Sequence, residues 1–124
     1  MKRYLFGGIL AVACTCAIAQ DTGWSYQYAT PKHAIRVSCP APTSNACTYE
    51  VWNRPRTVGQ GKADLVIENG RHELFANGNS QYVFTSGKVR IALFDSLRDT
   101  SENTLTVYVD GRLRSRYPLE PVSR

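Results

Sequence analysis

One stretch, QYVFTSGKVRIALF at residues 81–94, constrains the fold most strongly because its pattern predicts a β-hairpin. A two-residue turn at Ser86-Gly87 would place Phe84 opposite Val89 on one apolar face. The other face, which carries Val83 and Arg90, is expected to be largely exposed. The hairpin therefore presents one face to a core and one to solvent.

Similar short segments with alternating apolar and polar residues recur along the chain, and each is typical of a half-buried strand. Further strands are predicted at residues 24–29, 34–38, 47–53, 63–67, 71–75, 104–109 and 113–117. The segment 47–53 carries apolar side chains on both faces, which predicts a central strand with Trp52 in the core. Residues 95–103 are polar and predict a loop or one helical turn capped by Asp95 or Ser96.

Two turn signals set the connections between these strands. Asn69-Gly70 favours a tight type I′ turn, so residues 63–94 are predicted to form a four-strand meander. At the last hairpin, a three-residue loop at 110–112 would align Leu105 with Tyr117 and send Arg114 and Arg116 outward. Together the segments predict an all-β fold, a small antiparallel sandwich or barrel of about eight short strands.

The N-terminus has the pattern of a secretory signal peptide. Lys2 and Arg3 precede an apolar run, and Ala17-Ile18-Ala19 offers small residues for cleavage before Gln20. We therefore expect a signal peptide at 1–19, a single β domain at 20–124 and a periplasmic location. An alternative is a lipoprotein acylated at Cys14. No later segment reaches the roughly 20 apolar residues of a membrane span, so no transmembrane segment is expected.

Cys39 and Cys47 are the two cysteines of the predicted mature chain. An exported protein meets an oxidising compartment, which predicts a disulfide between them. The eight-residue separation matches neither a redox pair nor a four-ligand zinc set. No cofactor or metal is expected.

The charge of the chain does not by itself indicate a nucleic-acid partner, and none is expected. Loss of Lys2 and Arg3 with the signal lowers the formal charge from +5 to +3, which is too small to indicate nucleic-acid binding. Most of the remaining cations are arginines, and these suit carboxylate-rich protein partners.

Catalytic motifs are absent from the sequence: there is no G-x-S-x-G, C-x-x-C or phosphate-binding loop. His33, in a predicted loop, and His72, on a predicted strand, are expected at the surface. Four carboxylates that the fold might bring together are Asp64, Glu68, Glu73 and Asp95. Surface charge is the simpler interpretation of these residues, and we expect that the protein is not an enzyme.

Two surface features are candidates for partner binding. The first is the predicted hairpin tip, with Ser86, Gly87, Lys88 and Arg90, a preformed basic loop suited to an acidic cleft. The second is the arginine row of the last hairpin, in which Arg114 and Arg116 follow Arg112. An ordinary solvated turn and a charge-protected edge strand are the respective alternatives.

An early cysteine, the strand sequence Tyr49-Glu50-Val51 and the Ser86-Gly87 turn resemble the periplasmic or membrane-bound inhibitors of c-type lysozyme. In that family a serine from a Ser-Gly loop and a lysine contact the acidic catalytic residues of lysozyme. The resemblance implies these roles for Ser86 and, more loosely, for Lys88.

These patterns together predict an exported periplasmic protein that inhibits a partner enzyme by occlusion. The partner would be a lysozyme-like cell-wall hydrolase or a secreted toxin, the second case making this an immunity protein. The alternative is a structural or accessory module of an envelope or secretion assembly that pairs through an exposed strand.

Overall fold

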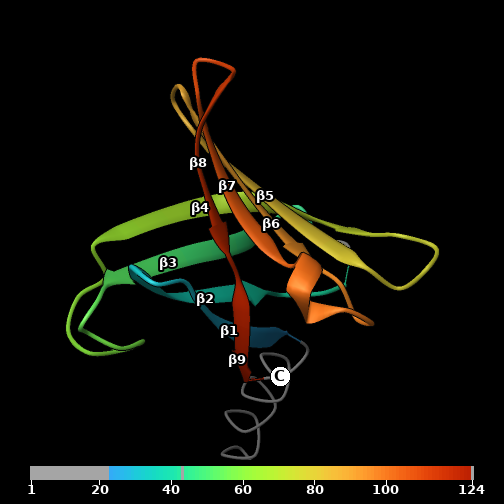
Figure 1. Ribbon diagram of the computed structural model, residues 1–124, viewed down its shortest axis with the longest axis horizontal. Helices are drawn as coiled ribbons and strands as arrows, with labels where there is room; N and C mark the ends of the chain where they lie inside the picture. Colours follow the sequence, from blue (N-terminus) through green and yellow to red (C-terminus); the bar gives the residue numbers. More distant parts are fainter. Residues whose placement is uncertain (1–22, 43, 124) are drawn as a thin grey trace, which may run out of the picture.

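The computed structural model describes residues 23–42 and 44–123, and these form an all-β fold (Figure 1). The strands are β1 (Trp24–Ala29), β2 (His33–Cys39), β3 (Cys47–Asn53), β4 (Leu65–Leu74), β5 (Ser80–Ser86), β6 (Val89–Asp95), β7 (Thr104–Val109), β8 (Arg112–Pro118) and β9 (Glu120–Ser123). A 3-10 turn, η3 (Thr100–Glu102), precedes β7. The predicted signal peptide and Cys14 lie outside the described residues.

All nine strands form one antiparallel sheet in the order β8-β7-β6-β5-β4-β3-β2-β1-β9. Only Leu119 separates β8 from β9, so one stretch of chain pairs first with β7 and then with β1. The sheet thereby curls into a nearly closed barrel, which confirms the predicted fold class. The count is nine because the predicted segments 63–67 and 71–75 merge into β4, whereas the last segment continues into two strands, β8 and β9.

Inward-facing side chains from all parts of the sheet fill the barrel. Ile35, Val37, Phe84 and Leu93 have no exposed surface, and Leu105 has 1%. They alternate along their strands with more exposed residues, as the period of two requires. The barrel interior is therefore the hydrophobic core.

Trp52 is buried in the central strand β3, as predicted, with 2% of its surface exposed. Its indole nitrogen donates a hydrogen bond of 2.9 Å to the Gly61 carbonyl. The guanidinium of Arg36 lies 5.3 Å from the ring centre. The loop between β3 and β4 is thus held against the sheet by this side chain.

Cys39 and Cys47 form the predicted disulfide, with their Cα atoms 4.2 Å apart. The bond joins the end of β2 to the start of β3, and both cysteines are almost completely buried. It therefore closes the connection between two neighbouring strands at one end of the barrel.

The predicted turn at Asn69-Gly70 is wrong, because both residues lie inside the continuous strand β4. Asn69 has a φ of 61°, and the pairing with β3 shifts register beside Gly70, which marks a β-bulge. The first half of β4 pairs with β3 and the second half with β5. The bulge is thus a corner at which one strand passes between the two halves of the barrel, and residues 63–94 form three strands.

A side chain at Gly70 would collide with the core. An added Cβ would lie 2.1 Å from Cδ1 of the Phe84 ring. Glycine is therefore required by the close approach of Phe84 to the bent strand. This packing, rather than a turn, accounts for the glycine.

The β5–β6 hairpin forms, but its turn comes one residue later than predicted. Ser86 pairs with Val89 and Phe84 pairs with Ile91, so Gly87-Lys88 is the turn. A register change of two residues leaves each side chain on its predicted face. Val83 is nevertheless buried, with 8% exposure, on the face expected to be exposed.

The loop of the last hairpin is one residue shorter than predicted. Val109 pairs with Arg112 across a two-residue turn, Asp110-Gly111, in which both φ angles are positive. A register shift farther along the hairpin, between Val107 and Tyr108, restores the predicted pairing of Leu105 with Tyr117. The residue that the prediction assigned to the loop is thus accommodated by the register shift within the strands.

Neither predicted cap begins the helical turn in the β6–β7 connection. The side chain of Asp99 caps η3 by accepting a hydrogen bond from the Ser101 amide. Asp95 and Ser96 are buried instead, with 3% and 2% exposure. Asn103 joins the two ends of this connection by accepting a 2.6 Å hydrogen bond from the Ser96 amide.

Candidate functional site

The β5–β6 and β7–β8 hairpins extend together beyond the barrel, and we call this projection, residues 85–90 and 107–116, the basic horn (Figure 1). Gly87 (φ 59°) and Gly111 (φ 78°) supply the positive φ angles of the two turns. Asp110 (φ 53°) adopts the left-handed conformation that aspartate tolerates better than most residues. The sequence at both turns thus favours tight tips.

The two tips of the horn are joined to each other. The Asp110 amide donates a hydrogen bond of 3.0 Å to the Lys88 carbonyl. Directly below it, Val89 pairs with Val109 between β6 and β7. The horn is therefore one four-stranded unit whose loops hold a fixed relative position.

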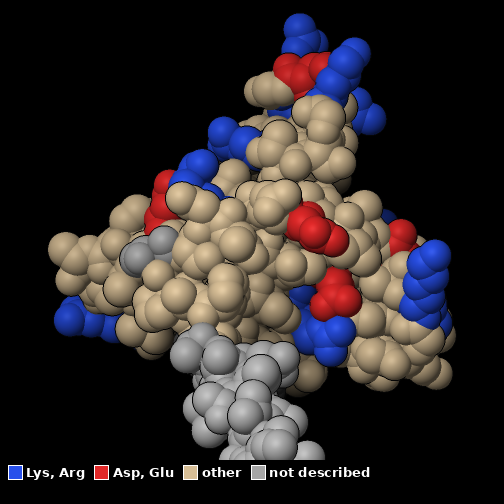
Figure 2. Space-filling view, turned by 180° about the vertical axis from the view of Figure 1, so that it is seen from behind, with Lys and Arg blue, Asp and Glu red and all other residues tan. Residues whose placement is uncertain are grey.

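Charge on the horn is strongly biased toward cations. Lys88, Arg90, Arg112, Arg114 and Arg116 lie on it, and Asp110 is its one acid. Figure 2 shows the Lys and Arg side chains gathered around acidic atoms at the end of the projection. In the described part of the chain, the three ion pairs lie elsewhere, on β2–β3, in the β3–β4 region and on β4. The horn therefore presents a net positive surface.

Arg90 and Tyr108 form an ordered contact on the flank of the horn. The Arg90 guanidinium lies 4.9 Å from the centre of the Tyr108 ring, and the two residues are direct cross-strand partners. A cation over an aromatic face is attracted by the ring quadrupole. This contact holds the Arg90 side chain while leaving the residue exposed.

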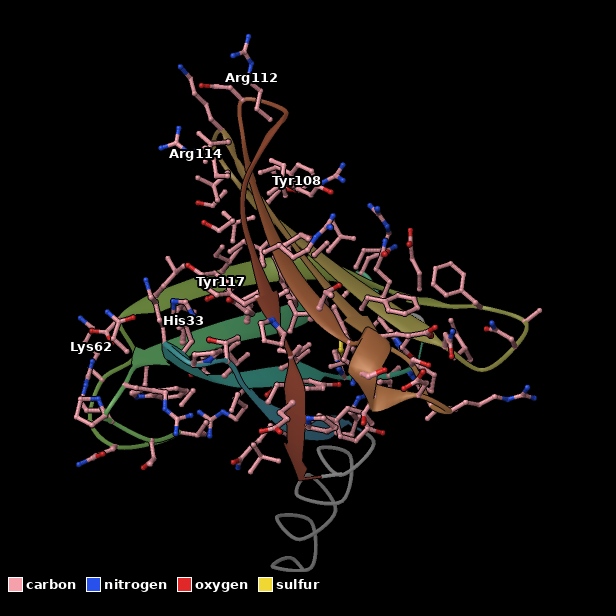
Figure 3. All side chains as sticks on the ribbon, in the orientation of Figure 1. His33, Lys62, Tyr108, Arg112, Arg114 and Tyr117 are labelled. Atoms are coloured by element: carbon pink, nitrogen blue, oxygen red, sulfur yellow. A yellow bond between two sulfur atoms is a disulfide. The ribbon has the colours of Figure 1, made fainter. Side chains whose placement is uncertain are left out.

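The two patches predicted as alternative binding sites lie on this one projection. Ser86, Gly87 and Lys88 form one tip, and Arg114 and Arg116 lie on β8. Figure 3 shows Arg112 and Arg114 at the far end of the horn and Tyr108 lower on it. The fold thus brings together residues more than twenty positions apart.

Leu113 was missed as a candidate contact residue. It lies between Arg112 and Arg114 and is 51% exposed. An exposed leucine between two cations offers apolar contact area at the centre of a charged tip. The signal was present in the sequence RLRSR, but the predicted pairing of Val109 with Leu113 placed this leucine on the apolar face of the hairpin.

Three of the four carboxylates considered for catalysis have separate surroundings, and the fourth, Glu68, is exposed on β4. Asp64 pairs with Arg56, and its pKa is lowered, mainly by the hydrogen bond from the Asn53 amide. Glu73 pairs with Arg71, whereas Asp95 accepts a 2.7 Å hydrogen bond from the Tyr28 hydroxyl. Within residues 23–42 and 44–123, no group of three or more His, Cys, Asp or Glu side chains is arranged to hold a metal ion.

The prediction that His72 lies at the surface is wrong, because the residue is only 7% exposed. Its ring stacks on Tyr82 at 4.5 Å and meets Trp24 edge-on at 5.6 Å. Its Nε2 lies 3.0 Å from the Ser80 hydroxyl. His72 follows the β4 corner and lies in this aromatic cluster instead of at the surface.

His33 is the first residue of β2 instead of part of a loop. It is half-buried; its Nδ1 lies 2.8 Å from the Thr30 hydroxyl and its ring meets Tyr117 edge-on at 5.3 Å. Figure 3 shows these two rings at the base of the horn. Burial and, secondarily, the charge of Lys32 lower the pKa of His33.

We expect the protein to lose stability as the pH falls through the range in which unfolded histidine titrates. Burial lowers the pKa of His72 below its ordinary value of 6.5. Below that pH, His72 therefore binds a proton more readily in the unfolded chain than in the folded chain. The contribution of neutral His72 to the free energy of unfolding is fully present above about pH 6.5 and is lost as the pH approaches the pKa of His72 in the folded protein. Urea unfolding between about pH 7.5 and about pH 5 measures this loss.

A His72→Phe variant provides the control, because phenylalanine retains an aromatic ring at this position and cannot titrate. The variant should lose less stability between the two pH values than the wild type. An equal loss in both proteins would show that protonation of His72 does not contribute.

No protein-family model, curated protein or solved structure matches the chain. Among the described residues, no helix has the length and apolar character needed to cross a bilayer. A functional proposal for this chain therefore rests on the geometry and chemistry of its surface.

Proposed function

We propose that this is an exported periplasmic protein that inhibits a partner enzyme by occlusion, with the basic horn inserted into an acidic cleft. The observation that carries the proposal is the horn itself. It joins two hairpin tips and carries five cationic side chains but a single acidic one. The proposed action is binding and requires no chemistry by this chain. A lysozyme-like cell-wall hydrolase, or a toxin with similar activity, has the required kind of cleft.

Rigidity supports an occluding role for the horn. The hydrogen bond from Asp110 to Lys88 and the continuous pairing of β5 to β8 fix the tips before a partner arrives. A preformed loop loses little conformational entropy on binding, so more of the contact energy appears as affinity. A fixed projection also blocks a cleft better than a flexible loop that substrate can displace.

Chemical complementarity supports an acidic partner. Arginines form paired hydrogen bonds to carboxylates, and Leu113 adds apolar contact area between Arg112 and Arg114. Interfaces commonly place apolar contacts at the centre and charged contacts around them. We therefore expect a partner cleft with acidic walls and a small apolar patch at its base.

The experiment begins with purified protein, obtained by expressing the full chain, and a panel of lysozymes and other cell-wall hydrolases. A stoichiometric complex that abolishes hydrolysis and weakens with salt is the expected result. Capture of envelope components with no loss of hydrolase activity would instead favour the structural module. That alternative has one supporting feature: among the described strands β8 pairs only with β7, so its other edge is open for strand addition.

Charge reversal on the horn is the decisive variant for the inhibitor. Arg112→Glu with Arg114→Glu should weaken the complex by about 100-fold or more, because two attractive contacts become repulsive. The matched control is Arg98→Glu, an exposed arginine beyond the opposite end of β6 from the horn. Equal affinities in the horn variant and the control, with both proteins folded, would remove the horn as the binding site.

A further inference from the structure

A hollow of about 510 Å³ lies beside the bend at which the chain passes from β8 into β9 (Figure 1). Its lining comes from the β1–β2 turn, the segment after β3, the η3 turn and the bend itself. The volume lies within the range of about 300–1,000 Å³ that is typical of small-molecule sites. The hollow therefore has room for a small organic ligand.

Backbone hydrogen bonds hold the walls of the hollow in place. The Leu119 amide, in the bend, donates to the Asn103 carbonyl at 3.1 Å, which joins the bend to the end of the η3 turn. The Arg54 amide donates to the Lys32 carbonyl at 3.0 Å, which joins the segment after β3 to the β1–β2 turn. A ligand would therefore enter a site whose walls are already formed.

Two residues of opposite charge line the hollow beside the end of β1. The guanidinium of Arg54 donates a hydrogen bond of 3.4 Å from Nη1 to the Thr30 carbonyl. Glu120 is the cross-strand partner of Ala29, the residue before Thr30. The two charged residues therefore border neighbouring positions of the same strand end.

Neither charge is neutralised by an ion pair within the described part of the chain. The three ion pairs among residues 23–42 and 44–123 involve other side chains, so Arg54 and Glu120 pair neither with each other nor with a third described residue. A guanidinium has five N–H donors, and one bond to Thr30 leaves most of them available. Both charged residues are exposed, so a ligand can reach them from solvent.

The rest of the lining is partly apolar and partly hydroxylic. Pro31 and Pro118 are exposed and offer the carbon atoms of their rings. Thr100 and Ser101 are also exposed, and the Ser101 hydroxyl donates to Asp99 at 2.6 Å, so its oxygen can accept from a ligand. The complementary ligand is therefore small, carries both charges and has an apolar part.

We propose that this hollow binds a small zwitterion, either a free amino acid or a dipeptide. The ligand carboxylate would accept hydrogen bonds from Arg54, the ligand ammonium group would donate to Glu120, and an apolar side chain would lie against the proline rings. An anion would suit Arg54 but would be repelled by Glu120, and a cation would meet the opposite difficulty. A ligand with both charges is attracted at both ends.

The proposed zwitterion site is separate from the basic horn and goes beyond the proposed inhibition. None of the residues that line it belongs to residues 85–90 or 107–116. The horn variant Arg112→Glu with Arg114→Glu should therefore leave the affinity for a zwitterion unchanged. Failure of one proposal leaves the other measurable.

The two charges of the ligand can be tested separately. In ¹H–¹⁵N spectra of the purified labelled protein, L-leucine and L-leucyl-L-leucine are titrated beside isocaproate, which lacks the ammonium group of leucine, and isoamylamine, which lacks its carboxylate. The amide signals of Thr30, Ser101 and Glu120 should shift and saturate with at least one zwitterion. Both single-charge analogues should bind at least about tenfold more weakly than the tighter zwitterion, because each lacks one charge-assisted contact.

Substitutions identify which residue meets which charge. In Arg54→Gln, the affinity for the zwitterion should fall about tenfold, and removal of the ligand carboxylate should then make little further difference. Glu120→Gln should show the same pattern for the ligand ammonium group. Arg98→Gln changes an exposed arginine outside the lining and should leave the affinity unchanged.

Three results would overturn the proposal. The first is binding of isocaproate or isoamylamine as tightly as the zwitterions, which would indicate a site for a simple ion. The second is unchanged affinity in both glutamine variants, with both proteins folded. The third is the absence of any saturable shift at the highest soluble concentrations of the two zwitterions.

Discussion

Replacing Gly70 by alanine should destabilise the protein by about 3 kcal/mol, the upper part of the range for an overpacked core. The added Cβ would lie 2.1 Å from Cδ1 of Phe84, a ring with no exposed surface. The ring is enclosed by the barrel, so the strand or the ring must move. The midpoint and slope of urea unfolding measure the loss.

Two further variants test this explanation. Gly87→Ala is the control: its φ of 59° is strained for alanine, but an added Cβ meets nothing within 4 Å, so the expected loss is about 1 kcal/mol. The Gly70→Ala/Phe84→Leu double variant should lose less stability than the sum of the losses in the two single variants, because each change relieves the packing defect that the other creates. Strictly additive losses would show that the ring is not the obstacle.

Removing the disulfide should cost about 2–3 kcal/mol, the loop-closure contribution of a short ring. The Cys39→Ala/Cys47→Ala double variant and the reduced wild type should both show this loss in urea unfolding. The bond fixes the connection between β2 and β3, so the unfolded chain gains freedom when it is broken. Reductant should not change the urea unfolding of the double variant. If reductant also left the unfolding of the wild type unchanged, the prediction would be contradicted.

Strand positions were predictable where one face of a strand is buried and the other is not. Segments 24–29, 47–53 and 104–109 match β1, β3 and β7 in full. Each has a clear alternation, which is the signal that a half-buried strand leaves in its sequence. The disulfide was predictable for a different reason, since only two cysteines remain beyond the predicted signal peptide.

The turn at Asn69-Gly70 was mispredicted because two structures require the same residues. A tight hairpin turn and a β-bulge each need a positive φ or a glycine. The deciding factor is the Phe84 ring, which comes from a strand more than ten residues away and occupies the space of a Gly70 side chain. No local pattern carries that information, and the error also misplaced His72.

The candidate site was predictable in its residues but not in its arrangement. Lys88, Arg90 and the arginines of β8 were visible as two basic patches, whereas the contact between the tips depends on the pairing of β6 with β7. The aromatic cluster around His72 was not predicted at all. It forms because the β4 corner brings His72 beside Tyr82 and Trp24, which are far apart in the sequence.

The pairing of β9 with β1 joins the two ends of the described chain, so barrel closure requires both ends. β1 is the first described strand and β9 the last, and no other described strand covers the β9 edge of β1. Until Glu120–Ser123 is available, that edge stays open however well the intervening strands have paired. Removal of Leu119 and β9 would add the outer edge of β1 to the edge that β8 already leaves open, so β9 limits the sheet edge available for pairing with other chains.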